Sequence, residues 1–250
     1  MKNVAIIQAR MSSSRLPGKV LLPLSGIPVL EHVTQRVKMS KLLNKVIIAT
    51  SIDVSDNAIE EWCKNNNIEF YRGSLDDVLD RFYVAACFYG AENILRITAD
   101  CPVIDFEIID EVIEKYHKEN YDYYGLSGEF PDGLDCTMIS FFALETAWKN
   151  AKLKSEREHV GPYIEKHPDL FKIGGYEKFE KLGHIRLTLD EPRDYKLLSY
   201  IFENLYVKDK YFRHQMILTL LNEQPNLLEI NNKIQRNEGY INSIFNDGNT

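Results

Sequence analysis

The sequence is poor in the features that mark several large protein classes. Its four cysteines, at positions 63, 87, 101 and 136, are far apart and include no C-x-x-C pair, so neither a zinc site nor a disulfide framework is indicated. Its apolar runs, such as residues 46–49, are a handful of residues long, whereas a membrane-spanning helix needs about 20. The opening segment is too short for the apolar core of a signal peptide. We therefore expect a soluble cytoplasmic protein with reduced thiols and no membrane partner.

Positive charge is also in short supply. The 250 residues include 30 lysines and arginines against 37 aspartates and glutamates, a formal net charge of −7. This balance argues against nucleic acid as the main partner, because a polyphosphate backbone is bound by a broad cationic surface. The hydrophobic fraction of 44% and the charged fraction of 27% are ordinary for a globular chain and exclude a disordered or collagen-like one. A small anionic ligand would need cations gathered at one place.

The first 120 residues alternate between strand-like and helix-like segments. Residues 4–8 form a continuous apolar run with β-branched side chains, typical of a buried strand. Residues 76–89 carry apolar side chains at helical spacing, with Ser74 placed to cap the helix. Four such β–α units in succession predict an α/β protein with a mostly parallel sheet and helices on both faces. The expected strands are 4–8, 45–50, 68–71 and 94–99, and the expected helices are 28–38, 55–66, 76–89 and 106–118.

The pattern changes after about residue 120. Strand-like segments at 121–126 and 137–141 flank a stretch rich in Gly, Pro and Asp. We interpret residues 122–180 as an insertion into a single α/β domain of residues 1–250, with a helical C-terminal region over 192–245. The remaining expected elements are helices at 143–151 and 156–167 and strands at 171–174 and 185–189.

The most informative segment follows the first strand directly. Residues 8–19 read Gln-Ala-Arg-Met-Ser-Ser-Ser-Arg-Leu-Pro-Gly-Lys, which places Arg10, Arg15 and Lys19 close together beside several serines. Open parallel sheets bind ligands in loops at the carboxyl ends of their strands, and a cationic loop there suits a polyphosphate. The segment matches neither the G-x-x-x-x-G-K-[ST] loop nor the G-x-G-x-x-G fingerprint. A surface loop with scattered basic side chains is the alternative.

Two aspartates follow strand-like segments. Asp100 comes directly after residues 94–99, and Asp190 directly after residues 185–189, just before Pro192. Mg²⁺ in proteins is typically held by one or two carboxylates together with phosphate oxygens and water. The two aspartates are therefore candidate Mg²⁺ ligands, although aspartates at strand ends also cap helices.

Four motifs together resemble one known family. They are A-R-x-x-S-x-R-L-P-G-K at 9–19, R-G-S-x-D-D-V-L-D-R at 72–81, T-A-D-C-P at 98–102 and R-E-H-V at 157–160. They resemble the cytidylyltransferases that activate sugar acids, of which the CMP-Kdo synthetases are the best known, and most closely the branch called spore coat polysaccharide biosynthesis protein F. The resemblance covers residues 3 to about 205. It implies a Rossmann-like three-layer nucleotidyltransferase fold and transfer of CMP from CTP to a sugar acid or related acidic acceptor. Pyrophosphate would be released, and the product would serve surface polysaccharide synthesis.

The resemblance also implies roles for the matched positions. Arg10, Arg15 and Lys19 would hold the triphosphate of CTP as catalytic cations, and Asp100 and Asp190 would hold Mg²⁺, with Asp100 also counted as catalytic. The strand before the first of these aspartates carries Thr-Ala where the CMP-Kdo synthetases have Gln-Gly, which leaves the details of nucleotide contact open. The residues expected to contact the nucleotide are Ala9, Arg10, Ser13, Lys19, Thr50, Asp53, Arg81 and Thr98.

For the acceptor, the R-E-H-V motif indicates Arg157 and His159. An Arg–His pair can bind a carboxylate or a phosphate, and the imidazole can accept a proton. The alternative is that Arg157 is a solvated helix residue and His159 is half-buried. In this family the inserted segment forms the homodimer contact, so a homodimer is also implied.

Three other functions are weighed against this one. A nucleotide-sugar-dependent glycosyltransferase could use a similar sheet, but such enzymes often carry a D-x-D metal motif, which the sequence lacks. A cytidylyltransferase acting on a phosphate or phosphonate acceptor would use the same nucleotide site, and the sequence does not distinguish it from a cytidylyltransferase acting on a sugar acid. A non-catalytic nucleotide sensor is disfavoured because both candidate metal ligands are present.

Overall fold

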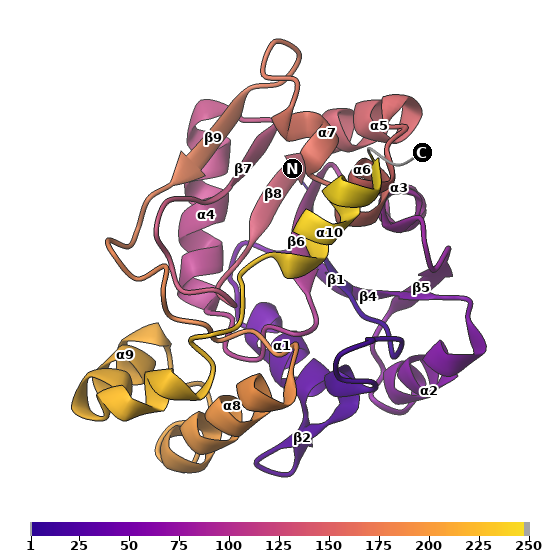
Figure 1. Ribbon diagram of the computed structural model, residues 1–250. Helices are drawn as coiled ribbons and strands as arrows, with labels where there is room; N and C mark the ends of the chain where they lie inside the picture. The colour runs from indigo at the N-terminus through magenta and orange to yellow at the C-terminus, as the bar shows by residue number, and fades with distance from the viewer. Residues whose placement is uncertain (1, 248–250) are drawn as a thin grey trace.

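The computed structural model describes residues 2–247, whose centre is a seven-stranded sheet (Figure 1). The strands of this sheet are β1 (Asn3–Gln8), β4 (Lys45–Ser51), β5 (Phe70–Gly73), β6 (Asn93–Thr98), β7 (Tyr123–Leu126), β8 (Thr137–Ser140) and β9 (Ile173–Tyr176). Their spatial order is β5-β4-β1-β6-β8-β7-β9, with β1 pairing in parallel with β4 on one side and β6 on the other. Within this sheet β8 alone runs against its neighbours, so the expected mostly parallel sheet is confirmed.

Helices cover both faces of the sheet. They are α1 (Val29–Lys38), α2 (Asn57–Asn65), α3 (Val78–Tyr89), α4 (Phe106–Glu119), α5 (Phe141–Asn150), α6 (Lys154–His159), α7 (Pro162–Glu165), α8 (Pro192–Leu205), α9 (His214–Glu223) and α10 (Glu238–Asp247). Successive side chains of β1 point to opposite faces, as the strand geometry requires. Ala5 and Ile7 pack in the core that includes α1, α2 and α4, whereas Val4 and Ile6 pack in the core that includes α3 and α5. This three-layer α/β/α architecture confirms the expected fold class.

Two helices show how the local sequence sets their ends. The N-terminus of α3 is capped by Asp77, whose carboxylate accepts from the N–H of Asp80, and the Ser74 hydroxyl accepts from the N–H of Asp77. The cap thus lies three residues beyond the serine that the sequence favoured. At the other end, Gly90 has a φ of 61°, a left-handed conformation that glycine adopts without a Cβ clash. α8 begins at Pro192. The N–H groups of the first helical turn have no acceptor within the helix, so the missing N–H of proline costs no hydrogen bond there.

The prediction of a strand at residues 185–189 is wrong. This segment forms a single bridge, between Arg186 and Asp132, and is otherwise irregular. Two of its N–H groups donate to carbonyl groups of loops and not to a strand of the sheet. The N–H of Leu187 donates to the Asp132 carbonyl at 2.7 Å, and the N–H of Leu189 donates to the Asp100 carbonyl at 2.8 Å. The apolar side chains of this segment are buried although its backbone is not paired as a strand. A buried apolar run of this kind has the same sequence pattern as a buried strand.

The helix expected at 156–167 is two short helices, α6 and α7. The break is at Val160, whose φ of 69° lies in the left-handed region and cannot continue a helix. Pro162, which lacks an N–H, then begins α7. The region from Pro192 onward is helical in segments, with α8, α9, the 3₁₀ helix Pro225–Ile230 and α10 separated by loops.

Residues 122–180, which we predicted to be an insertion, extend the central sheet. β8 pairs antiparallel with β6, and β7 and β9 continue the same sheet beyond it. The C-terminal helix α10 then crosses in front of β6 and packs against α6 (Figure 1). Between residues 2 and 247, no helix is both long enough and apolar enough to cross a bilayer.

Candidate functional site

The carboxyl ends of β1 and β6 border a crevice. The chain moves from β1 to β4 and β5 on one side and then crosses to β6 on the other side of β1, so the connections diverge at this point. Open α/β sheets bind ligands at such a switch point. We call this cavity the β1–β6 crevice. It is lined by Gln8, Ala9, Arg10, Ser13, Lys19, Val20, Arg81, Thr98, Ala99 and Asp100.

The loop after β1 is folded back on itself by hydrogen bonds. The N–H of Gly18 donates to the Met11 carbonyl at 2.9 Å, and the N–H of Met11 donates to Asp56 Oδ1 at 2.7 Å. Gly18 has a φ of 72°, which makes glycine the suitable residue at this turn. The 3₁₀ helix Lys19–Leu21 follows at once and places the Lys19 side chain in the crevice. The glycine and the lysine of the sequence motif therefore have distinct roles, one in the turn and one in the site.

The Lys19 ammonium lies between two carboxylates. Its Nζ donates to Asp100 Oδ2 at 2.6 Å and to Asp190 Oδ1 at 2.7 Å. Burial disfavours the charged ammonium, but the two carboxylates outweigh burial and raise the pKa of Lys19. Burial likewise favours a neutral Asp100, yet the adjacent Lys19 charge lowers the pKa of Asp100 to about 2. Two aspartates that are 90 residues apart in sequence thus face one cation.

The donor set at this point fits Mg²⁺. Two carboxylates converge where a cation, the Lys19 ammonium, already lies. Mg²⁺ takes one or two protein carboxylates and fills its remaining positions with phosphate oxygens and water. Within residues 2–247, no group of three or more His, Cys, Asp or Glu side chains is arranged to hold a metal ion by itself. The side chains present therefore suit a divalent cation that arrives with a phosphate ligand.

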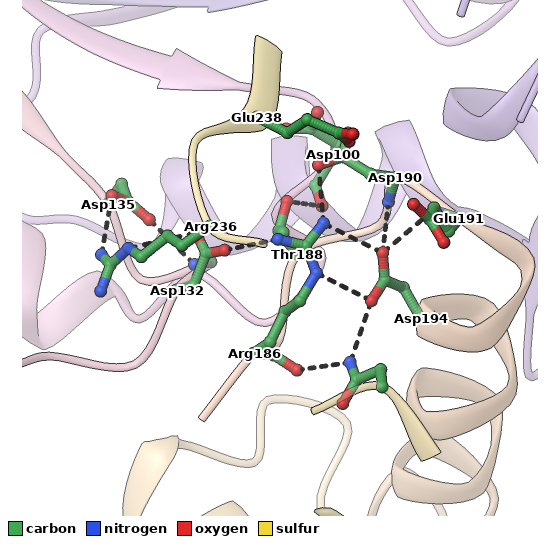
Figure 2. Close-up of polar contacts among 12 residues, drawn as sticks. Asp100, Asp132, Asp135, Arg186, Thr188, Asp190, Glu191, Asp194, Arg236 and Glu238 are labelled. Carbon is green, nitrogen blue, oxygen red and sulfur yellow. Dashed lines mark hydrogen bonds and ion pairs between the residues drawn. The ribbon is translucent and has the colours of Figure 1, made fainter. Parts of the chain in front are cut away.

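Asp190 belongs to a buried network around Arg186 (Figure 2). Arg186 Nη2 donates to Asp190 Oδ2 at 2.9 Å. Its Nε donates to Asp194 Oδ1 at 3.0 Å, and its Nη1 donates to Asp132 Oδ2 at 2.9 Å. The fully buried Asp194 also accepts from the N–H groups of Asp190 and Glu191, both at 3.0 Å. This network, and not a strand end, fixes the position of the Asp190 carboxylate.

Two arginines of the predicted set also lie in the crevice. Arg10 is exposed there and has no ion pair with any residue in the range 2–247. Arg81 is buried, and one nitrogen of its guanidinium donates to the Ser74 carbonyl at 2.9 Å. Burial lowers the pKa of Arg81 to about 10, which leaves it charged at neutral pH. Together with Lys19, they make this end of an acidic protein locally cationic.

Arg15 connects the loop to the C-terminal helix. Its Nη2 lies 3.3 Å from Asp190 Oδ2, and its Nη1 donates to Glu238 Oε2 at 2.6 Å. Glu238 is the first residue of α10, and Figure 2 shows it above Asp100 and Asp190. Arg15 and Lys19 therefore share one carboxylate, that of Asp190, which each contacts through a different oxygen.

Thr50 and Asp53 are not among the residues that line the crevice. Thr50 is fully buried at the end of β4, and its Oγ1 has no hydrogen-bond partner within the described chain. Asp53 caps the short 3₁₀ helix Val54–Asp56 by accepting from the N–H of Ser55 at 2.8 Å. Their contact with a nucleotide stays a prediction that the position of neither side chain supports.

Arg157 is also placed away from the crevice. Its Nε donates to both carboxylate oxygens of Asp77, to Oδ1 at 3.0 Å and to Oδ2 at 2.9 Å. Its Nη1 donates to the Trp148 carbonyl at 2.7 Å. These bonds tie α6 to the N-terminus of α3 and the end of α5. The guanidinium charge is thus already neutralised by Asp77, and the predicted contact with an acceptor has no support in this position.

His159, in contrast, lines a second cavity beside the crevice. Its Nε2 is 3.1 Å from the Ser243 hydroxyl of α10, which donates to Glu158 Oε2 at 2.8 Å. Because the hydroxyl hydrogen is directed at an oxygen, the imidazole must donate its Nε2–H to Ser243, which leaves Nδ1 unprotonated. Burial lowers the pKa of His159 below its usual value, so the ring is neutral at pH 7.

The second cavity contains residues that the sequence analysis missed. We call it the side cavity; it has a volume of about 240 Å³ and shares Gln8, Thr98 and Asp100 with the crevice. Arg96 of β6 lies in its wall, and a charged residue within an otherwise apolar strand was the available signal. The C-terminal segment contributes Asn237, Glu238, Gly239 and Tyr240. No local sequence feature links that segment to residue 96.

Comparison with known proteins decides the family. A family model described as cytidylyltransferase matches residues 4–234. The chain belongs to the cytidylyltransferase family. It is 33% identical to the spore coat polysaccharide biosynthesis protein SpsF of Bacillus subtilis, over 88% of this chain and 94% of that protein. It is 34% identical to a 3-deoxy-manno-octulosonate cytidylyltransferase of Geobacter sulfurreducens, over 45% of this chain and 44% of that protein.

A solved structure supports the same assignment. The cytidylyltransferase of Leptospira borgpetersenii superposes with a TM-score of 0.85 at 31% identity, covering 91% of this chain and 97% of that one. The resemblance found in the sequence is therefore confirmed, and this cytidylyltransferase is a nucleotidyltransferase. The matched residues end at 234, so α10 and the residues just before it lie outside the part shared with the family model.

Proposed function

We propose that this cytidylyltransferase uses Mg²⁺ to transfer CMP from CTP to an acidic acceptor with release of pyrophosphate. The observation that carries the proposal is the Lys19 ammonium held by Asp100 and Asp190 at the switch point of the sheet. This arrangement offers a cation for phosphate oxygens and two carboxylates for a divalent ion in one place. The acceptor class and the metal are the parts that experiment must decide.

The triphosphate would lie along the loop that follows β1. Arg10 is the readiest contact because its charge is unpaired within residues 2–247 and it lines the crevice. Ser13 lies in the same wall and can donate a hydroxyl hydrogen bond. Lys19 and Arg15 would exchange a carboxylate partner for a phosphate oxygen when the nucleotide binds. Ala9, Arg81 and Thr98 line the remainder of the crevice and would face the nucleoside.

Asp100 and Asp190 would hold the Mg²⁺. The ion would supply positive charge to the phosphate oxygens, which is the chemistry that a phosphoryl transfer needs as charge moves to the leaving group. The protein side chains supply the rest. Lys19 and the two arginines of the loop neutralise the triphosphate, so that a negatively charged acceptor can approach it. The acceptor oxygen attacks the α-phosphorus, and the bond from that phosphorus to the β-bridging oxygen breaks.

His159 would take the proton of the acceptor hydroxyl. Its Nδ1 lacks a proton because Nε2 donates to Ser243, and the ring lines the side cavity that also reaches Asp100. A neutral imidazole is the form that can act as a base at pH 7. Arg157, the other residue predicted for the acceptor, instead braces the helix that carries His159 through its ion pair with Asp77.

The acceptor is proposed to be a sugar acid or related acidic sugar used for a surface polysaccharide. The names of the two relatives support this, one for spore coat polysaccharide and one for 3-deoxy-manno-octulosonate. A phosphate or phosphonate acceptor is the alternative, since the same nucleotide site would serve it. We also propose a cytoplasmic homodimer formed through the inserted segment, which exposes Phe142 and Leu170 by 57% and 51%.

Pyrophosphate release tests the proposed reaction. With CTP, Mg²⁺ and a panel of sugar acids and sugar phosphates, we expect release of pyrophosphate with at least one acceptor and at least tenfold less with ATP or GTP. EDTA in excess over Mg²⁺ should abolish the release, and added Mg²⁺ should restore it, because without the ion the two carboxylates would repel the negatively charged triphosphate. Release that is unaffected by EDTA would contradict the metal assignment.

A further inference from the structure

Arg96 is a cation without a counterion in the wall of the side cavity. It belongs to the central strand β6, where its backbone pairs with Ile6 of β1 and Thr137 of β8. Its Nε is buried and has no hydrogen-bond partner, and no carboxylate within the described chain forms an ion pair with it. The side chain as a whole is half-buried, so its guanidinium is partly removed from water while no carboxylate pairs with it, which leaves it able to bind an anion from outside the chain.

The neighbouring arginines differ from Arg96 in this respect. Arg186 contacts three aspartates, and Arg157 is held by Asp77. Arg15 is shared by Asp190 and Glu238. Among the arginines of residues 2–247 that line the side cavity, Arg96 is therefore the one that remains available to an anion supplied from outside the chain.

The cavity around Arg96 connects it to the reaction centre. Arg96, Thr98 and Asp100 occupy alternate positions along β6 and its end, and all three line the side cavity. At a rise of about 3.3 Å per residue, four residues separate the backbone of Arg96 from that of Asp100 by about 13 Å. An acceptor whose anionic group pairs with Arg96 and whose hydroxyl lies near Asp100 would therefore lie along this wall of the cavity.

The C-terminal segment closes the outer side of this cavity. Asn237 and Tyr240 line it together with Arg96 and His159, and the same four residues line an adjoining cavity of about 220 Å³. The Tyr240 ring meets the His159 ring edge-on, with centroids 5.1 Å apart. This segment lies beyond the residues matched by the family model.

We propose that Arg96 binds the anionic group of the acceptor, a carboxylate or a phosphate carried on a polyhydroxylated chain, under the wall formed by Asn237 and Tyr240. This rests on the proposed function, since the side cavity opens toward the same Asp100 as the nucleotide crevice. The planar guanidinium can bind either anion through two parallel hydrogen bonds. Arg96, and not Arg157, thus selects an acidic acceptor.

Calorimetric titration of the full chain tests this assignment. The first titration uses a CTP analogue with a methylene bridge between its α- and β-phosphates, in the presence of Mg²⁺, and reports on the nucleotide site alone. The second titrates gluconate, glucose 6-phosphate or the neutral polyol glucitol into the complex. We expect an acidic probe to bind at least tenfold more tightly than glucitol, because a charged hydrogen bond is lost with the neutral compound. The tighter of the two acids identifies the anionic group.

Three variants make the result specific. Arg96→Gln should weaken binding of the acidic probe at least tenfold and leave the affinity for the CTP analogue within twofold, which also shows that the fold is intact. Arg96→Lys should recover part of the affinity. Arg213→Gln, which removes a half-buried arginine paired with Glu107, should change neither titration.

Two outcomes would overturn the assignment. One is equal binding of the acidic probes by Arg96→Gln and the unchanged protein, and the other is binding of neither acid more tightly than glucitol. If the CTP analogue itself does not bind, the proposed function fails. The acid titrations are then made on the free protein, where the same comparison of Arg96→Gln with the unchanged chain decides the anion site separately.

Discussion

Replacing Lys19 with methionine is expected to lower kcat for CTP-dependent pyrophosphate release at least 100-fold. The side chain keeps its length and apolar stem, but the charge that faces Asp100 and Asp190 is lost. A fixed charge or donor aimed at charge that develops during a reaction typically contributes two to three orders of magnitude in rate. Steady-state measurement of pyrophosphate release at saturating CTP gives the comparison directly.

A matched lysine controls for loss of a surface charge. Lys149 on α5 is 55% exposed and pairs with Glu145 one helical turn away. Lys149→Met should leave kcat within twofold, because an exposed pair of this kind contributes little. A kcat for Lys19→Met within threefold of the unchanged enzyme would remove Lys19 from the reaction.

The second large effect is expected on stability, at Asp194. This carboxylate is fully buried and accepts from Arg186 and from the N–H groups of Asp190 and Glu191. Asp194→Asn keeps the shape but removes the charge and turns one acceptor into a donor that faces other donors. We expect the free energy of unfolding to fall by about 3 kcal/mol, as when one partner of a buried ion pair is removed.

Urea denaturation measures this change, with Glu203→Gln as the control. Glu203 is exposed on the same helix, so its replacement should alter the free energy of unfolding by less than about 0.5 kcal/mol. Because Asp194 fixes the turn that carries Asp190, the Asp194→Asn enzyme should also require more Mg²⁺ for half-maximal activity. Equal stability of the two variants would show that the Arg186 network does not hold the site together.

The fold was predictable where a segment is regular and its pattern repeats. Four β–α units in the first 120 residues have apolar runs and helical spacing that leave little choice but a parallel sheet. The loop at 9–19 follows its strand directly, so its cations could be placed at the sheet edge from the sequence. Asp100 could be placed by the same reasoning, because it also follows a strand.

The rest depends on contacts between distant segments. Residues 185–189 are buried against loops and are not paired as a strand. The composition of such a segment does not distinguish it from a buried strand. Arg157 forms an ion pair with Asp77, 80 residues earlier, so the R-E-H-V motif alone could not show that its charge is already paired. The side cavity brings Arg96 next to residues 237–240, and nothing local to either segment indicates this.

A crystal structure of the protein with CTP and Mg²⁺ tests the central claim most directly. We expect one Mg²⁺ within about 2.1 Å of a carboxylate oxygen of both Asp100 and Asp190. The Lys19 ammonium and the Arg10 guanidinium should contact phosphate oxygens of the same nucleotide. A triphosphate bound away from the 9–19 loop, or a metal ion that touches neither aspartate, would contradict the account.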